Sequence, residues 1–178
     1  MTLLEQTSMT LEIPITLRMV VRTDLSKLEW YGQYTHYRPL FRRAFRDQQA
    51  GRRFMLVAVT KDFPIGMVFI QLQSNERKVA DGATRAYLYS LRVMEMFRGK
   101  GVGTQLIREA ENTLLDRGFQ WTTIAVAKDN HGARRLYERL RYRIFSDDPG
   151  QWNFVDHWGK ARHINEPCWL LEKNLLMR

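Results

Sequence analysis

The chain has 178 residues and one cysteine, and its 28 lysines and arginines outnumber its 19 acidic residues, giving a formal net charge of +9. This length is enough to bury a sizeable core, and a single cysteine excludes an internal disulfide or a cysteine-based metal cluster. No apolar run approaches the roughly 20 residues of a membrane span, and the N-terminal segment lacks the basic start of a secretory signal. We therefore expect a cytoplasmic protein without a membrane partner, with a tail at 1–14 and one domain at 15–178.

Apolar periodicity predicts a strand, two helices and two further strands in the first half of the chain. These elements are a strand over 15–21, a helix from the cap Thr23-Asp24 through Leu25, Leu28 and Trp30, a helix over 40–49 closed by Gly51, and paired strands over 54–59 and 65–70 joined by a turn at 61–64. A polar loop is expected over 74–82.

The second half is predicted to alternate strands and helices. In order, these are a strand over 86–93, a glycine-rich turn at 98–103, a long helix ending at Gly118, a strand over 121–126, a short helix over 131–140, a strand beginning at 142–145 and a last strand over 168–172. The resulting order, βααβββαβαβ and a final strand, predicts a mixed α/β fold with helices on both faces of one sheet.

The glycine-rich turn at 98–103 (RGKGVG) is the most informative segment, because it stands between a predicted strand and a predicted helix. Glycines carry no side chain to obstruct a ligand that approaches the backbone. The N-terminus of the following helix presents unpaired N–H groups, which bind phosphate oxygens. Arg98 and Lys100 add positive charge, so the turn predicts a polyphosphate site.

The spacing of the glycines excludes two common phosphate motifs. A P-loop needs a lysine at the end of the loop, followed by serine or threonine, whereas Lys100 lies between glycines. The dinucleotide fingerprint needs a third glycine three residues after the second. That position is Thr104 counted from Gly101, and Leu106 counted from Gly103.

The turn instead matches the motif Arg/Gln-x-x-Gly-x-Gly/Ala at Arg98, Gly101 and Gly103, and a second motif, Asn-x-x-Ala-x-x-x-Tyr, begins at Asn130 and ends at Tyr137. With these two motifs in this order, the chain resembles the GNAT superfamily of N-acetyltransferases, most clearly over 84–145. The resemblance implies the GNAT fold: a mixed α/β (α+β) fold with a central, mostly antiparallel twisted sheet of about seven strands, splayed in the middle, and helices on both faces.

The same resemblance implies acetyl-CoA as co-substrate and no metal. The pyrophosphate of coenzyme A would lie on the glycine turn, and the pantetheine arm would pair with the main chain of Leu91 and Val93. The cofactor-binding residues implied in this way are Leu91, Val93, Arg98, Gly99, Lys100, Gly101, Val102, Gly103, Thr104, Asn130 and Tyr137.

Tyr137 is the implied catalytic residue, a general acid for the leaving thiolate. Its register with Asn130 and Ala133 supports this role. A core role stays open, because Ala133, Leu136, Tyr137 and Leu140 share one helical face. Asn130 likewise has two roles open, as the cap of the helix and as a partner of the pantetheine arm.

Two positions depart from the family pattern. Arg141 stands where the family helix is usually followed by glycine, and the segment 84–87 (TRAY) lacks the glutamate that many members carry as a base. The nearest candidates for a base are Glu95, Asp129, His131 and His157. Deprotonation through ordered water is the other route.

Two aromatic-rich segments are candidates for acceptor recognition. The segment 146–167 is expected to be a loop without regular secondary structure, used for recognition, packing or a dimer contact; it contains Trp152, Phe154, Trp158, Asp147, Asp148, Asp156, His157 and His163. The second segment either walls the acceptor site or belongs to the core, and contains Trp30, Tyr31, Tyr34, His36 and Tyr37.

These observations favour an N-acetyltransferase, an acyltransferase that moves the acetyl group of acetyl-CoA to a primary amine of a small molecule, peptide or protein. One alternative is a GNAT-like acyl-CoA-binding regulatory module without efficient catalysis, which the missing carboxylate supports. The other is a basic nucleic-acid-associated protein, whose binding would fall steeply with salt. The basic residues are spread along the chain rather than gathered in a recognition motif, so we expect an anionic cofactor rather than nucleic acid.

Overall fold

The computed structural model describes residues 9–177; residues 1–8, which make up most of the predicted tail, and Arg178 lie outside the described part. The strands are β1 (Thr16–Met19), β2 (Arg53–Thr60), β3 (Phe63–Gln71), β4 (Arg85–Val93), β5 (Trp121–Ala127), β6 (Arg143–Asp148), β7 (Gln151–Val155), β8 (Ala161–Asn165) and β9 (Cys168–Asn174). The helices are α1 (Arg38–Gln49), α2 (Val102–Leu115) and α3 (His131–Arg139), with four short 3₁₀ turns between elements. Within residues 9–177, no helix is long and apolar enough to cross a membrane.

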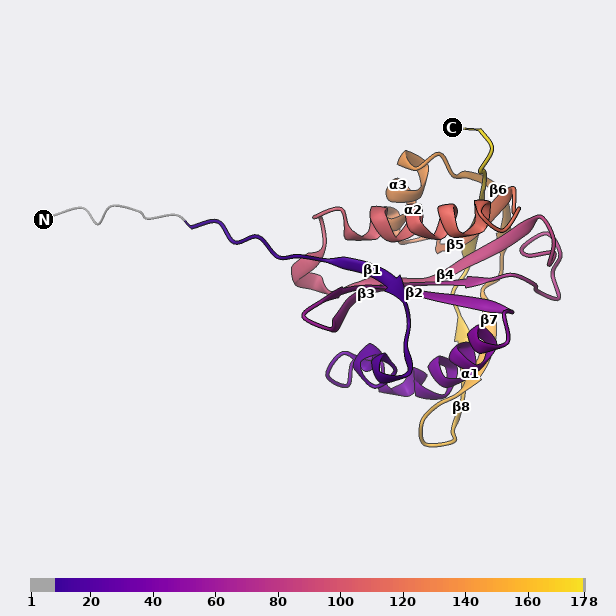
Figure 1. Ribbon diagram of the computed structural model, residues 1–178. Helices are drawn as coiled ribbons and strands as arrows, with labels where there is room; N and C mark the ends of the chain where they lie inside the picture. Colours follow the sequence, from indigo (N-terminus) through magenta and orange to yellow (C-terminus); the bar gives the residue numbers. More distant parts are fainter. Residues whose placement is uncertain (1–8, 178) are drawn as a thin grey trace, which may run out of the picture.

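Seven strands form one sheet in the order β1-β2-β3-β4-β5-β9-β6, and β7 and β8 form a separate hairpin. Every neighbouring pair of the large sheet is antiparallel except β4 and β5. The helices α2 and α3 cover one face of the sheet, and α1 lies on the other face beside the hairpin (Figure 1). The predicted fold class, a mostly antiparallel seven-stranded sheet with helices on both faces, is confirmed.

Two apolar cores lie on the two faces of the sheet, and β2 shows why. Its residues from Phe54 to Val59 are all buried, which matches the uninterrupted apolar sequence expected of a strand covered on both faces. Leu56 packs into the core under α2 and α3. Its neighbour Met55 packs into the core under α1, because successive side chains point to opposite faces.

The predicted helix through Leu25, Leu28 and Trp30 is wrong. The chain forms 3₁₀ turns at Arg22–Asp24 and Lys27–Glu29 instead. Trp30 and Tyr31 follow with φ of 42° and 57°, a left-handed conformation that ends a helix. The apolar spacing reflects burial and not a helix, since Leu28 and Trp30 are buried in the core under α1.

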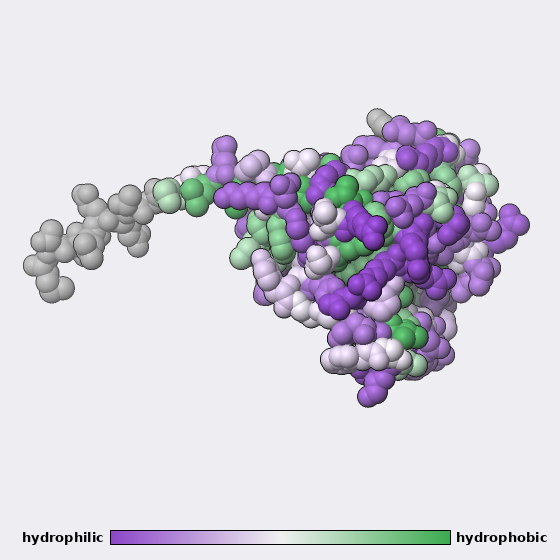
Figure 2. Space-filling model, turned by 60° about the horizontal axis from the view of Figure 1, so that its bottom comes forward, coloured by the Kyte–Doolittle hydropathy of each residue, from purple (hydrophilic) through white to green (hydrophobic). Residues whose placement is uncertain are grey.

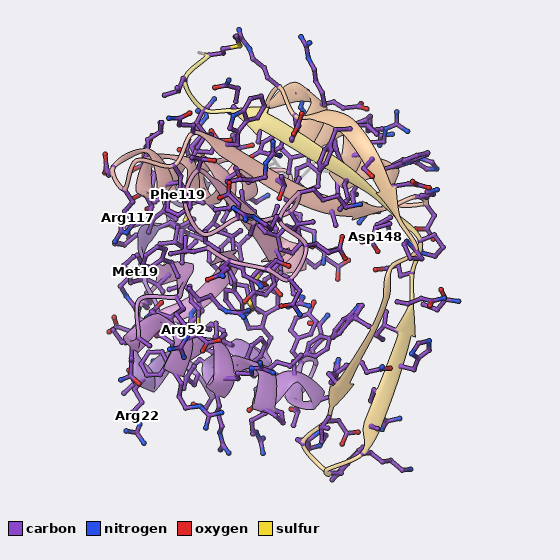
Figure 3. All side chains as sticks on the ribbon, turned by 90° about the vertical axis from the view of Figure 1, so that its right-hand side faces the viewer. Met19, Arg22, Arg52, Arg117, Phe119 and Asp148 are labelled. Atoms are coloured by element: carbon purple, nitrogen blue, oxygen red, sulfur yellow. The ribbon has the colours of Figure 1, made fainter. Side chains whose placement is uncertain are left out.

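The predicted absence of regular structure over 146–167 is also wrong. β6 continues to Asp148, and β7 pairs with β8 from Gln151–Asn165 to Val155–Ala161. The hairpin turn is organised by Asp156, which is buried. Its carboxylate accepts hydrogen bonds from the N–H groups of Trp158 and Lys160 and from Nε of Arg162. The hairpin extends from the main sheet alongside α1, with Asp148 at the junction (Figure 3).

Candidate functional site

The sheet opens between its two parallel strands. The ladder that joins β4 to β5 runs from Arg85–Trp121 to Leu88–Ile124. β4 continues beyond this ladder to Val93, and β5 to Ala127. Beyond the ladder, β4 still pairs with β3 and β5 with β9, but β4 and β5 no longer pair with each other. The main-chain groups on their facing edges are therefore free to bind a ligand in the opening. The expected splay of the sheet is present.

A β-bulge in β4 sets the directions of the side chains at this opening. Tyr89 and Arg92 are the partners of Phe69 and Met67 in β3, so β4 carries one residue more than β3 between these pairs. Ser90, within the bulge, has a φ of 54°. A bulge of this kind redirects the strand beyond it.

The bulge separates the residues of β4 by face. Leu91 and Val93 pack toward the core under α2, and Tyr89 packs toward the core under α1. The N–H of Met94 donates to the oxygen of Ile65 in β3 at 2.8 Å. Because backbone groups alternate between the two edges of a strand, the N–H and C=O of Val93 face the opening.

The glycine turn leads from β4 into α2 and leaves its outer side open. Gly99 and Gly101 have φ of 71° and 84°, and no atom lies within 4 Å of the point where a Cβ would stand on either residue. Gly101 is the N-cap of α2, without a side-chain cap. The first N–H groups of this 14-residue helix are thus available to phosphate oxygens. Lys100 is exposed beside them.

The two residues at the ends of the turn make contacts that shape it. Nε of Arg98 donates to the main-chain oxygen of Val93 at 2.9 Å. Gly103 lies inside the first turn of α2, where an added Cβ would stand 3.7 Å from Val93 and 3.8 Å from Leu136. The turn therefore sits directly against the end of β4 and against α3. Val102 is buried and Thr104 is half-buried.

Asn130 caps α3. Its side-chain oxygen accepts a hydrogen bond from the N–H of Ala133 at 3.1 Å, so the capping role that the sequence left open is confirmed. Capping fixes the start of the helix, and through it the direction in which Tyr137, two turns later, projects.

Tyr137 lies in the core between α3 and the sheet, 5% exposed. Its ring centroid stands 6.1 Å from that of Tyr142. Burial raises the pKa of its hydroxyl well above the ordinary value, so the group stays protonated at neutral pH. Its hydroxyl is not among the hydrogen bonds formed within residues 9–177. The hydroxyl is therefore free to donate to a ligand.

A cavity of about 630 Å³ lies on the opposite side of the opening, on the face that carries α1. Ser90 and Arg92 of β4 line it together with Ala125 and Ala127 of β5, which are the parts of these strands beyond their shared ladder. The hairpin contributes Trp152. The cavity thus reaches the opening from the side opposite to α2 and Tyr137.

The two aromatic segments of the sequence meet at this cavity. The ring centroid of Tyr37 lies 5.1 Å from that of Phe154 and 6.5 Å from that of Trp152. Trp30, in contrast, is 4% exposed and belongs to the core. Trp158 is 75% exposed. The first segment therefore supplies both a core residue and a wall of the cavity.

Several titratable groups gather at one end of the cavity, around Tyr87. Burial raises the pKa of Tyr87 far above its ordinary value, and the neighbouring Cys168, Asp148 and Tyr137 raise it further. Burial also raises the pKa of the Cys168 thiol to about 11, so this thiol is not ionised at neutral pH. Three carboxylates line the cavity, those of Glu76, Asp148 and Glu166.

The residues named from the sequence as possible bases do not line this cavity. Glu95, Asp129 and His131 are exposed and lie in the 3₁₀ turn before Arg98 and at the start of α3. His157 lies in the hairpin turn. The segment 84–87, which has no carboxylate of its own, contains Arg85. Nη1 of Arg85 forms an ion pair with Oε2 of Glu172 at 2.6 Å.

Sequence reasoning missed Tyr87, Tyr89 and Arg92 as cavity residues. The strand pattern of 86–93 does alternate, and that alternation was the available signal. The bulge at Ser90, however, shifts the alternation of the side chains by one residue. No local feature of the sequence predicts this bulge. Within residues 9–177, no group of three or more His, Cys, Asp or Glu side chains is placed to hold a metal ion.

The splayed sheet, the open glycine turn at the start of α2 and the capped helix α3 are features of one mixed α/β fold with a seven-stranded sheet. The chain belongs to the acetyltransferase (GNAT) family, whose model matches residues 22–142. It is 31% identical over 124 residues to N-alpha-acetyltransferase 30 of Schizosaccharomyces pombe, a match that covers 69% of this chain and 73% of the relative. The assignment as an acyltransferase follows from this membership.

Solved structures share the fold at lower identity. Arabidopsis thaliana NAA60 in complex with acetyl-CoA superposes with a TM-score of 0.68 at 19% identity, covering 90% of this chain and 98% of that one. The ribosomal-protein-S18-alanine N-acetyltransferase of Escherichia coli superposes with a TM-score of 0.66 at 17% identity, covering 93% and 96%.

Proposed function

We propose that this protein transfers the acetyl group of acetyl-CoA to a primary amine that enters through the cavity beside α1. The single observation that carries the proposal is the end of the β4–β5 ladder at Leu88 and Ile124. It creates one opening with the glycine turn on one side and the cavity on the other. A donor and an acceptor that enter from opposite faces meet there, which is the proximity that a two-substrate transfer requires.

Acetyl-CoA fits the residues on the α2 side. In our proposal the phosphates lie on the N–H groups of 98–104, with Arg98 and Lys100 as charged partners. The pantetheine arm pairs with the main chain of Leu91 and Val93. The oxygen of Val93 already accepts one hydrogen bond, from Arg98, but a carbonyl oxygen has a second lone pair.

The chemistry needs two proton movements. The amine nitrogen forms a bond to the thioester carbon, the carbon–sulfur bond then breaks, the nitrogen loses a proton and the thiolate gains one. We assign protonation of the thiolate to Tyr137, whose buried hydroxyl remains protonated. We assign the amine proton to Asp148, directly or through water, because this half-buried carboxylate lines the cavity near Tyr87.

The acceptor we favour is the α-amine of a peptide. The support is the 31% identity to an N-alpha-acetyltransferase, together with a cavity that is walled by aromatic side chains and open to the surface. The face that carries α1 is covered mainly by hydrophilic side chains (Figure 2), which suits a solvated acceptor. Small-molecule and protein amines are the other acceptors to be compared.

The test combines acetyl-CoA binding by calorimetry with thiol release in the presence of a panel of peptides and small amines. Gly101→Val should abolish acetyl-CoA binding, because its side chain would occupy the open outer side of the turn. Gly118→Val is the matched control: Gly118 has a φ of 83°, close to that of Gly101, and likewise has no atom within 4 Å of its Cβ position. Both variants carry the same backbone strain, and only Gly101 lies at the proposed phosphate site.

The outcomes separate the alternatives. Acetyl-CoA binding without thiol release for any amine would identify a binding module instead of an enzyme. Unchanged acetyl-CoA affinity in folded Gly101→Val would show that the phosphates of acetyl-CoA do not bind at this turn. Salt-steep binding of DNA or RNA, in the absence of acetyl-CoA binding, would favour the nucleic-acid alternative.

A further inference from the structure

Arg92 is a half-buried cation at the edge of the cavity. Its guanidinium carbon stands 4.6 Å from the ring centroid of Tyr34 and 5.0 Å from that of Tyr37. Its Nη1 is buried and has no hydrogen-bond partner among residues 9–177. Arginine presents five N–H donors in a flat fork, so this side chain has unused capacity for a ligand.

The other half-buried arginine of the cavity, Arg53, has partners for its charge, although its Nε, like Nη1 of Arg92, is buried without a hydrogen-bond partner. Arg53 also lines the cavity, but its guanidinium donates to the hydroxyl of Tyr89 and lies 3.4 Å from the carboxylate of Asp47. Among the ion pairs formed within the described residues, none includes Arg92. The difference between these two arginines shows that Arg92 is not simply a structural ion-pair residue.

An unpaired buried charge destabilises a fold, because the lost hydration is not replaced. The rings of Tyr34 and Tyr37 compensate in part through cation–π contact. Burial accordingly lowers the pKa of Arg92, although a guanidinium stays charged at neutral pH. A charge without an ion-pair partner lowers the stability of the fold, and this one lies at the proposed reaction site. A ligand that pairs with the guanidinium explains best why it is there.

We propose that Arg92 binds a carboxylate of the acceptor, so that the preferred acceptor carries an acidic group close to the amine that is acetylated. This inference rests on the proposed function. Arginine and carboxylate form paired, charge-assisted hydrogen bonds. The substrate class that fits is a peptide with an acidic residue next to its N-terminus, and a free acidic amino acid offers the same chemistry.

The position of Arg92 fits this role. It lies between Leu91 and Val93, whose main chain faces the opening where the donor is proposed to lie, and its own side chain points to the cavity. The carboxylates of Glu76, Asp148 and Glu166 line the same cavity. An acceptor that carries both charges thereby finds a partner for each one. Its ammonium group faces the acidic residues of the cavity, and its carboxylate binds Arg92.

The first experiment uses the wild-type protein saturated with coenzyme A, so that binding is measured without turnover. Two amidated peptides that differ only by glutamate or glutamine at the second position are compared by calorimetry. The free amino acids glutamate and glutamine are compared as their α-amides, so that only the glutamate member of each pair carries a carboxylate. We expect the glutamate member of at least one pair to bind about tenfold or more tightly. The pair that discriminates identifies the peptide or the free amino acid as the source of the carboxylate.

The second experiment uses variants. Arg92→Gln should bind both members of the discriminating pair equally, and Arg92→Lys should retain part of the preference. Arg42→Gln is the control, because it removes one positive charge from the exposed outer face of α1; it should retain the full preference. Melting temperatures show whether each variant is folded. Arg92→Gln should be at least as stable as wild type, since it removes a half-buried charge that has no ion-pair partner among the described residues.

Equal affinities within both pairs for the wild-type protein would overturn the inference, whatever the variants do. So would a preference that survives in Arg92→Gln. The proposed function fails separately: selective binding without any thiol release would retain the carboxylate site and refute the transferase assignment. Thiol release that is equally fast with glutamate and glutamine peptides, without selective binding, would retain the transferase assignment and refute the carboxylate site.

Discussion

Nε of Arg98 donates a hydrogen bond to the main-chain oxygen of Val93 across 2.9 Å. This contact fastens the glycine turn to the end of β4, five residues earlier in the chain. One arginine therefore belongs to both halves of the proposed acetyl-CoA site, the turn for the phosphates and the strand for the pantetheine arm. The contact also occupies only one of its donors, which leaves the remaining N–H groups for a phosphate.

Arg98→Ala should weaken acetyl-CoA binding by roughly 1.5–3 kcal/mol, the contribution of a hydrogen bond to a charged group. The backbone N–H groups of the turn would remain, so binding should be reduced less than in Gly101→Val. Calorimetry of both variants makes the comparison. A larger loss for Arg98→Ala would mean that side-chain charge, and not the backbone, holds the phosphates.

A second prediction concerns the end of α3, where Arg141 has a φ of 70°. The N–H of Tyr142 donates to the oxygen of Tyr137, and the N–H of Arg141 donates to that of Glu138, both at 3.0 Å. These two bonds form a Schellman motif, whose left-handed position is usually glycine. The motif links Tyr137 to Tyr142 and so supports the catalytic candidate.

Arg141→Gly should therefore raise the free energy of unfolding by up to about 1 kcal/mol, because it removes the strain of a side chain in the left-handed region. Acetyl-transfer activity should not change, since Arg141 is exposed. Chemical denaturation of the two proteins tests the first point and thiol release the second. A less stable Arg141→Gly protein would show that the arginine side chain makes a contribution larger than its backbone strain.

The sequence was sufficient for the features that depend on local patterns. The glycine turn, the capped helix α3 and the strands β2 to β5 were predicted because each has a motif or an apolar repeat within a few residues. Arg141 was recognised as unusual for the same reason, and its left-handed conformation agrees with that interpretation.

The features that failed depend on contacts between distant segments. The hairpin at 151–165 has polar and apolar residues without a clear alternation, and it is held by the buried carboxylate of Asp156. The bulge at Ser90 has no local signature, yet it turns Arg92 into the cavity. The acceptor side of the site was therefore the part that the sequence could not place, whereas the donor side followed from its motifs.

The hairpin provides a third prediction, because its base is closely packed at Gly150. A Cβ on this residue, whose φ is 65°, would stand 1.7 Å from the main-chain oxygen of Glu166. Gly150 precedes β7 and Glu166 follows β8, so Gly150→Ala must separate the two ends of the hairpin and disturb the cavity that Gly150 and Glu166 line. Acceptor kcat/KM should fall by about 10²-fold, as for a misplaced substrate, with acetyl-CoA affinity unchanged.

Gly159→Ala is the control for this change. Gly159 lies in the turn of the same hairpin with a φ of 77°, but its Cβ position has no atom within 4 Å. It carries the backbone strain without the collision, and acceptor kinetics should stay near those of wild type. Equal kinetic losses in both variants would assign the effect to strain within the hairpin and not to its position.

A fourth prediction concerns acid stability. Burial raises the pKa of Asp156, but hydrogen bonds from Lys160, Arg162 and Trp158 lower it by more, so the net pKa lies below the ordinary value of 3.8. A carboxylate with a lowered folded pKa stabilises the protein above its unfolded pKa and loses that effect as pH falls toward the folded pKa. Asp156→Asn should therefore be less stable than wild type at pH 7.

The difference between the two proteins should narrow as the pH is lowered from about 4 toward the folded pKa. Thermal unfolding of both proteins at a series of pH values measures this gap. A gap that is constant between pH 7 and pH 3 would mean that the charge of Asp156 is not what stabilises the hairpin turn.

The last prediction separates catalysis from packing at Tyr137 by comparison with its neighbour Tyr142. The hydroxyl of Tyr142 is buried and donates to the carboxylate of Glu111 at 2.9 Å, whereas that of Tyr137 is free for a ligand. Tyr137→Phe should keep the melting temperature and acetyl-CoA affinity, while turnover falls by roughly 10²–10⁴-fold, the range of general acid–base catalysis. Tyr142→Phe should lower the free energy of unfolding by about 1–3 kcal/mol, because Glu111 loses a buried partner, and should keep turnover per folded molecule.

Turnover with a saturating peptide, measured beside thermal unfolding, distinguishes the two patterns. Full turnover in Tyr137→Phe would leave thiolate departure to water or main-chain donors, and a loss of stability there would make the hydroxyl a structural group.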